Sequence, residues 1–102
     1  MNTLKLGILG STNGTDLQAI LNAVSSGELD AKVSVVLSNR KNAYILERAE
    51  NHNVPSIYIF HKGKTREEFD AEMTTILKEH QVDLVLLIGF MRILSAEFCR
   101  EW

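Results

Sequence analysis

The sequence has few of the features that would place it outside the ordinary globular proteins. Its 102 residues contain one cysteine, Cys99, which excludes an internal disulfide and is typical of a reducing compartment. The sequence lacks an apolar run long enough to cross a bilayer and the apolar stretch of a secretory signal. The net charge of −2 gives no general attraction to nucleic acid or an anionic membrane. We therefore expect a cytoplasmic protein that binds neither nucleic acid nor membranes.

Short apolar runs alternate with helical patterns along the chain. Hydrophobic residues make up 45% of the sequence and charged residues 24%, which is typical of a soluble domain with its own core. The runs have the length of strands, and the apolar residues between them recur at the three- and four-residue spacing of amphipathic helices. The expected strands are 4–9, 33–37, 54–60 and 82–89, and helices are expected to begin near residues 15, 42, 65 and 95.

Capping residues mark several of these helix ends. Thr15 with Gln18 and Thr65 with Glu68 fit the capping-box pattern, in which both side chains bond to the first backbone N–H groups of a helix. Two further signals are a polar cap at Asn42 and a glycine stop at Gly27.

The order of these elements predicts the fold. A β-α-β-α-β-α-β series followed by the start of a helix implies right-handed crossovers between parallel strands. We expect an α/β, Rossmann-like domain over residues 1–102, with a mostly parallel sheet and helices on both faces. Phe98 and Trp102 are four residues apart, so the chain stops within an apolar helical stripe. This indicates a truncated, N-terminal piece of a larger enzyme, whose bare sheet edge would favour a homodimer.

Ligands of open α/β sheets bind beyond the carboxyl ends of the strands, so the loops at those ends are the first candidates for a site. The loop after the first strand lacks the glycine pattern of dinucleotide-binding folds and the lysine of the P-loop, which argues against a nicotinamide dehydrogenase. Arg40 and Lys41 follow the second strand and either face a ligand or lie in solvent. The three polar or basic loops expected at this edge are 10–16, 38–42 and 89–94.

Two interpretations fit the first loop. Gly14 leaves space for an anion to approach the backbone at the start of a helix, where the N–H groups and the helix dipole favour negative charge, and Thr15 adds a hydroxyl. An ordinary capped turn with Gly14 at positive φ accounts for the same residues equally well. Asp16 suits the helix dipole, but its carboxylate would compete with a bound phosphate for the same N–H groups.

The last loop and one further arginine are the other candidates. Arg92 interrupts an apolar run, and it either extends to solvent along its stem or borders an apolar slot for a flat heterocycle. Arg66 opens a helix, the end that disfavours a cation, and it either holds a carboxylate or pairs with Asp70 on an exposed face. The residues around Arg92 that would form the slot are Phe90, Met91, Ile93 and Leu94.

No catalytic or metal-binding group stands out in the chain. His80 falls on an apolar helical face and is expected to be half-buried, whereas His52 and His61 lie at loop edges without partners at zinc-ligand spacing. Cys99 has no base nearby in the sequence and is interpreted as a packing residue. We therefore expect neither a metal site nor a general base within these residues.

Four segments together resemble phosphoribosylglycinamide formyltransferase, or GAR transformylase, of purine synthesis. They are GSTNGTDLQAI after the first strand, SNRKNAYILERA, TREEFD, and LLIGFMRILSAEF after the fourth strand. Their order and spacing follow that family, and the resemblance covers the whole chain but only the N-terminal half of the family's sequence.

The resemblance implies formyl transfer from 10-formyltetrahydrofolate to glycinamide ribonucleotide, without a metal. It places the ribonucleotide phosphate at Gly14, Thr15 and Asp16, although the family's usual G-N-G-S-N has an amide where Asp16 stands. It implies that the folate lies against Arg66 and a loop formed by Met91, Arg92, Ile93 and Leu94.

The family's catalytic groups are an Asn, a His within N-x-H-P-S and a later Asp, and none of them falls within this chain. The resemblance therefore implies that the 102-residue chain alone is inactive. Methionyl-tRNA formyltransferase and formyltetrahydrofolate deformylase are related alternatives. A non-catalytic module that binds nucleotide phosphates is the alternative from another class.

Overall fold

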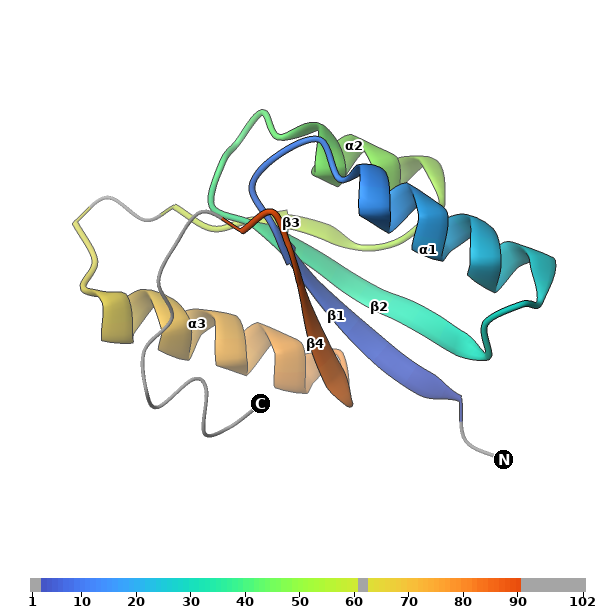
Figure 1. Cartoon of the computed structure of the whole chain (residues 1–102). Helices are drawn as coiled ribbons and strands as arrows, with labels where there is room; N and C mark the ends of the chain where they lie inside the picture. Colours follow the sequence, from blue (N-terminus) through green and yellow to red (C-terminus); the bar gives the residue numbers. More distant parts are fainter. Residues whose placement is uncertain (1–2, 61–62, 91–102) are drawn as a thin grey trace.

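The computed structural model describes residues 3–60 and 63–90 (Figure 1). Strands and helices alternate along these residues, as the sequence predicts. The expected helix near residue 95 lies outside the described residues. The elements are β1 (Leu4–Gly10), α1 (Thr15–Ser26), β2 (Ala31–Ser38), α2 (Tyr44–Asn51), β3 (Ser56–Tyr58), α3 (Arg66–Glu79) and β4 (Leu84–Ile88).

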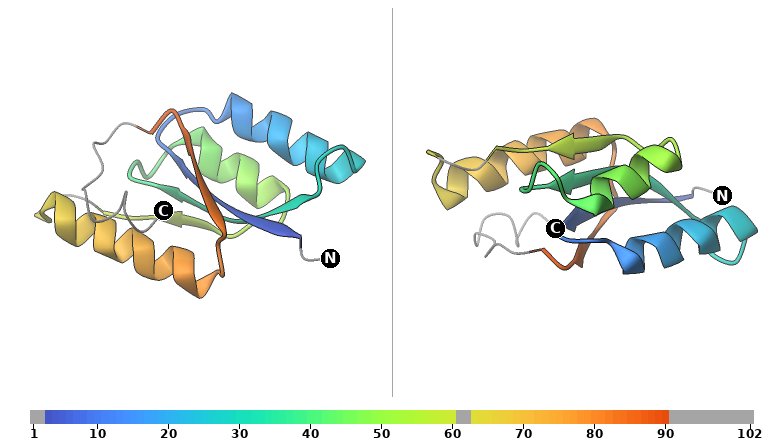
Figure 2. Two further views of the ribbon diagram at one scale, coloured as in Figure 1. Left: turned by 60° about the horizontal axis from the view of Figure 1, so that its bottom comes forward. Right: turned by 90° about the horizontal axis from the view of Figure 1, so that it is seen from above.

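The four strands form one parallel sheet with the order β3-β2-β1-β4. The chain moves outward from β1 to β3 and then crosses back to place β4 on the other side of β1. Helices α1 and α2 cover one face of the sheet and α3 covers the other, as Figures 1 and 2 show. The predicted Rossmann-like arrangement is confirmed, and the strand order reverses between β1 and β4.

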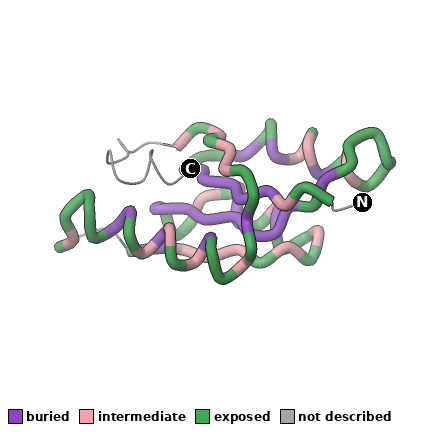
Figure 3. The backbone as a smooth tube through the Cα atoms, turned by 90° about the horizontal axis from the view of Figure 1, so that it is seen from below, coloured by how far each residue is buried: buried purple, intermediate pink, exposed green. Residues whose placement is uncertain are grey.

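The core consists of two apolar layers, one on each face of the sheet. The apolar residues of β2 enter both layers: Val33 and Val36 pack beneath α1 and α2, whereas Val35 and Leu37 pack against α3. Because both faces are covered, β1 and β2 are buried almost throughout, which Figure 3 shows as two purple strands. This double burial explains why the sequence of β2 is a nearly unbroken apolar run.

Two of the predicted helix caps are wrong. Gly14, and not Thr15, is the N-cap of α1, and no side chain caps this helix. Gly14 has a left-handed φ of 70°, which turns the backbone into the helix without help from a side chain. The N-cap of α2 is Ala43, and not Asn42. Gly27 caps the C-terminus of α1 at φ 84°, as predicted.

The capping box of α3 is present. Thr65 Oγ1 accepts a hydrogen bond from the Glu68 backbone N–H at 3.1 Å, and Glu68 Oε1 accepts one from the Thr65 N–H at 2.9 Å. The bond from the Thr65 backbone is the main cause that lowers the pKa of Glu68 from its ordinary value of 4.5. The folded-state pKa thus lies below the unfolded one, so the carboxylate stabilises the fold above pH 4.5, and this stabilisation is lost as the pH falls through the folded pKa.

Thr65→Ala is expected to lower the free energy of unfolding by about 1 kcal/mol at neutral pH, because it removes the cap of α3. It should also reduce the loss of stability on acidification that Glu68 causes. Urea unfolding at a series of pH values measures both effects. Thr75→Ala is the matched control, since Thr75 donates to the Ala71 carbonyl in the middle of the same helix. An equal loss of stability in the two variants would contradict the role given to the cap.

β4 pairs with β1 and has no second neighbour among the described residues. Its side chains Leu84 and Leu87 are 42% and 55% exposed. An apolar strand at a sheet edge is a surface that further strands can cover. Dimerisation through this edge stays a prediction. Within the ranges that the structure describes, no helix has the length and apolar character needed to cross a membrane.

Candidate functional site

The carboxyl ends of β1 and β4 lie side by side at the point where the strand order reverses. Gly10 pairs with Ile88 at the end of the two strands, and the Ser11 N–H donates to the Gly89 carbonyl at 3.2 Å. A cavity of about 270 Å³ opens here. The structure therefore brings the first predicted loop next to the beginning of the last one, at the position where open α/β sheets bind ligands. The cavity is lined by Thr12, Asn13, Gly14, Thr15, Asp16, Ile88 and Gly89.

Gly14 is required here by its conformation and its neighbour. Its φ is 70°, and a Cβ atom would lie 2.8 Å from the Cβ and 3.1 Å from the Cα of Ile45 in α2. The positive φ agrees with the interpretation as a capped turn, but the first turn of α1 has no side-chain cap. The predicted reason for the glycine needs correction, however, because the absent side chain would meet Ile45 rather than block an approach to the cavity.

The first turn of α1 exposes backbone donors at the cavity. The first backbone bond of the helix runs from the Gln18 N–H to the Gly14 carbonyl at 3.0 Å. The N–H groups of Thr15, Asp16 and Leu17 therefore precede the hydrogen-bonded part of the helix, and no side chain caps them. Because the positive end of the helix dipole adds to these donors, the geometry is suited to binding an anion.

Asp16 stands in the same turn, with an exposed side chain. Its carboxylate favours the isolated helix, because negative charge near the N-terminus offsets the dipole. The same charge repels an anion that enters the cavity. The structure thus places Asp16 in the lining of the cavity, and its competition with a bound anion stays a prediction.

The loop between β1 and α1 is held from its other side by α2 and by β2. The Thr12 carbonyl accepts from the Ile45 N–H at 3.1 Å, and the Asn13 carbonyl accepts from Arg48 Nε at 2.6 Å. Ser11 Oγ donates to Asn39 Oδ1 at 2.6 Å in a buried bond just beyond β2. No sequence pattern points to Arg48, because its contact with Asn13 joins residues 35 positions apart.

A wider hollow of about 990 Å³ continues from the first cavity over the ends of β2 and β3. The two share Thr12 and Asn13 in their lining. Arg40 and Lys41 border this hollow, and their side chains are exposed. They therefore lie near the candidate site and also contact solvent. Their positive charges lie on the side of the loop where they favour an approaching anion.

The predicted folate residues are only partly described. Arg66 is the first residue of α3 and its side chain is exposed, on the opposite face of the sheet from α1. It lines neither of the two hollows at the carboxyl edge. Its interpretation as one half of an exposed pair with Asp70 is wrong, because Asp70 is 2% exposed. The segment from Met91 to Leu94, with Arg92, lies outside the described residues.

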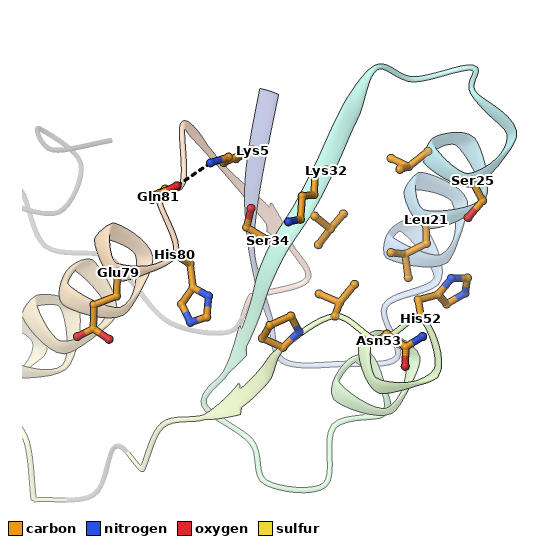
Figure 4. A pocket seen from close by; sticks show the side chains of 14 residues that line it. Lys5, Leu21, Ser25, Lys32, Ser34, His52, Asn53, Glu79, His80 and Gln81 are labelled. Carbon is orange, nitrogen blue, oxygen red and sulfur yellow. Dashed lines mark hydrogen bonds between the residues drawn. The ribbon is translucent and has the colours of Figure 1, made fainter. Parts of the chain in front are cut away.

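A third hollow lies at the amino ends of the strands. It has a volume of about 460 Å³, and Figure 4 shows Lys5, Lys32, His52 and His80 around it. Lys5 Nζ donates to Gln81 Oε1 at 2.7 Å across its edge. His80 is half-buried, as predicted. The described residues include no cluster of three metal-ligating side chains here or elsewhere. The carboxyl edge is therefore the candidate site, because ligands of parallel sheets gather there.

Comparison with known proteins agrees with the resemblance seen in the sequence. A trifunctional purine biosynthetic protein adenosine-3 from Drosophila melanogaster is 44% identical over 101 residues, which are 96% of this chain and 8% of that protein. A phosphoribosylglycinamide formyltransferase from Dictyostelium discoideum is 36% identical, and the match covers 98% of this chain and 53% of that protein. The chain thus spans about half the length of the Dictyostelium protein and 8% of the Drosophila protein.

Solved structures show the same fold. The crystal structure of glycinamide ribonucleotide transformylase 1 from Symbiobacterium toebii superposes with a TM-score of 0.92 at 36% identity, over 96% of this chain and 47% of that one. The predicted α/β, Rossmann-like fold is therefore confirmed. The sequence pattern of the formyl transferase family matches residues 4–102. The chain belongs to the formyl transferase family.

Proposed function

We propose that the complete protein transfers the formyl group of 10-formyltetrahydrofolate to the amine of glycinamide ribonucleotide, in the cytoplasm and without a metal. One observation carries this proposal for the chain itself: the uncapped N-terminus of α1 opens into a cavity at the strand-order reversal. A phosphate monoester suits this site, because several backbone N–H groups converge there with a helix dipole. The family match and the relatives named above support the choice of substrates.

The division of labour follows from the residues that are present. Formyl transfer needs attack of the substrate amine on the formyl carbon, stabilisation of a tetrahedral oxyanion, and movement of a proton from the amine to the departing folate nitrogen. The N-x-H-P-S stretch is absent from these 102 residues. We therefore assign binding and orientation to this segment: fixing the phosphate holds the amine at the reacting carbon and lowers the entropic part of the barrier.

Gly14, Thr15 and Asp16 are the proposed phosphate site. The folate contacts of Arg66, Met91, Arg92, Ile93 and Leu94 stay predictions. The assignment of these five residues comes from the resemblance. Its structural support is the exposed position of Arg66 at the start of α3.

The test is an assay of formyl transfer in which the absorbance of the folate product is recorded. The complete protein should turn over with glycinamide ribonucleotide as the acceptor, whereas the 102-residue chain alone should bind the ribonucleotide without turnover. Turnover by the chain alone would refute the assignment of binding without catalysis. Activity of the complete protein on methionyl-tRNA, or release of formate without an acceptor, would refute the choice of substrate.

A further inference from the structure

The loop between β1 and α1 directs two consecutive carbonyls toward α2. The Thr12 carbonyl accepts from the backbone N–H of Ile45 at 3.1 Å, in the first turn of α2, where backbone donors otherwise lack partners. The next carbonyl, that of Asn13, accepts from Arg48 Nε at 2.6 Å. The second bond is short and has a charged donor, so it is stronger than a bond between neutral groups.

These two bonds also fix the direction of the backbone N–H groups. All peptide bonds among the described residues are trans, so the C=O and N–H of each peptide point to opposite sides of its plane. With the carbonyls of Thr12 and Asn13 turned toward α2, the N–H groups of Asn13 and Gly14 point away from α2. Ile88 at the end of β4 borders the cavity, and β4 lies on the opposite side of β1 from β2 and β3, on which α2 packs. Asn13 and Gly14 thus extend the row of donors that the first turn of α1 begins.

Arg48 is itself held in place by its neighbours. Its Nη1 donates to Gln18 Oε1 at 3.2 Å, and its guanidinium carbon lies 4.7 Å from the centre of the Tyr44 ring. Gln18 Nε2 continues the network to Asn22 Oδ1 at 3.1 Å and to the His52 ring at 3.0 Å. The side chain of Arg48 is half-buried. A planar guanidinium that is already fixed by Gln18 and the Tyr44 ring loses little further freedom when it holds the loop.

We propose that Arg48 is a positioning residue for the phosphate loop: by holding the Asn13 carbonyl, it keeps the Gly14 N–H directed at the bound anion. The anion in question rests on the proposed function, in which it is the phosphate of glycinamide ribonucleotide. Arg48 acts through the backbone and on the side of the loop away from the cavity. Its effect therefore belongs to substrate binding, and the chemical step is untouched.

Inorganic phosphate and the complete protein provide the test. Arg48→Ala is expected to weaken phosphate binding about tenfold, because a charge-assisted hydrogen bond that orders the donors is lost. The shift of the Gly14 amide resonance during the titration should also decrease. Arg48→Lys keeps the charge but not the planar fork, so its phosphate affinity should lie between those of the wild type and Arg48→Ala. Lys32→Ala is the matched control, since it removes an exposed positive charge at the amino edge of the sheet and leaves the Asn13 carbonyl bonded; its affinity should stay within about twofold.

Formyl transfer gives a second readout that a merely structural role would not produce. Arg48→Ala should raise KM for glycinamide ribonucleotide about tenfold at nearly constant kcat. Equal losses of phosphate affinity in Arg48→Ala and Lys32→Ala would overturn the proposal in favour of a general charge effect. If Arg48→Ala does not fold, wild-type affinity in a folded Arg48→Lys would overturn it, and weakened affinity would support it. Phosphate binding without formyl transfer in the wild type would refute the proposed function alone.

Discussion

Gly14→Ala is expected to lower the free energy of unfolding by roughly 2 to 5 kcal/mol and to abolish measurable phosphate binding. The residue has a φ of 70°, which costs an L-amino acid about 1 to 2 kcal/mol. The added Cβ would also lie 2.8 Å from the Cβ of Ile45, an overlap that costs about 1 to 3 kcal/mol more. Relief of this overlap moves the loop away from α2 and disorders the donors at the cavity. Urea unfolding and a phosphate titration measure the two effects.

Gly27→Ala is the matched control for this substitution. Gly27 caps the other end of α1 at φ 84°, and nothing lies within 4 Å of an added Cβ. It should therefore show the conformational cost alone, and phosphate binding should be unchanged. If the two variants lose equal stability, the packing of the loop against Ile45 contributes nothing and this account of Gly14 is wrong.

Asp16→Asn is expected to tighten phosphate binding about tenfold, because it removes a negative charge from the turn that receives the anion. The same substitution should lower the free energy of unfolding by about 0.3 to 1 kcal/mol, since the carboxylate no longer offsets the helix dipole. Affinity should rise while stability falls, which is the mark of a residue that competes with the ligand. Isothermal titration calorimetry and urea unfolding test the two signs.

Asp30→Asn is the control for the change in net charge. Asp30 immediately precedes β2, at the amino edge of the sheet and the far end of α1 from the cavity. Its removal should leave phosphate affinity within about twofold, because charges separated by more than a Debye length are largely screened. Weaker phosphate binding by Asp16→Asn would show that the carboxylate supports the bound ligand, and the conflict described here would not exist.

The order of strands and helices could be predicted from the sequence because it depends on local patterns. The run from Val33 to Leu37 is apolar except for Ser34, since β2 is covered on both faces. Thr65 and Glu68 form their capping box within four residues, so the start of α3 follows from its own sequence. These features need no knowledge of which distant segments meet.

The caps of α1 and α2 could not be predicted in the same way. Thr15 and Asn42 carry side chains that often cap helices, but both helices begin under the control of contacts between them. Gly14 packs on Ile45, and the Thr12 carbonyl accepts from the Ile45 N–H in place of a side-chain cap. A local capping pattern contains no information about such a pairing.

The position of the candidate site could be predicted in part, because it follows from the order of the strands. Loops at the carboxyl ends of parallel strands meet at one edge, so the approach of the first loop to Gly89 follows from the predicted topology. No local pattern singles out Arg48, because in the sequence one arginine in a short helix cannot be told from a solvated charge. Its role becomes visible only when the fold places it beside Asn13.

The most direct test of the central claim is a titration of the complete protein with glycinamide ribonucleotide, followed through backbone amide resonances. We predict saturable binding at one site, with the largest shifts at Gly14, Thr15 and Asp16, and competition by inorganic phosphate. Shifts that bypass this loop and fall on the amino-edge hollow around Lys5, Lys32 and His80 would contradict it, as would an absence of binding at millimolar ligand.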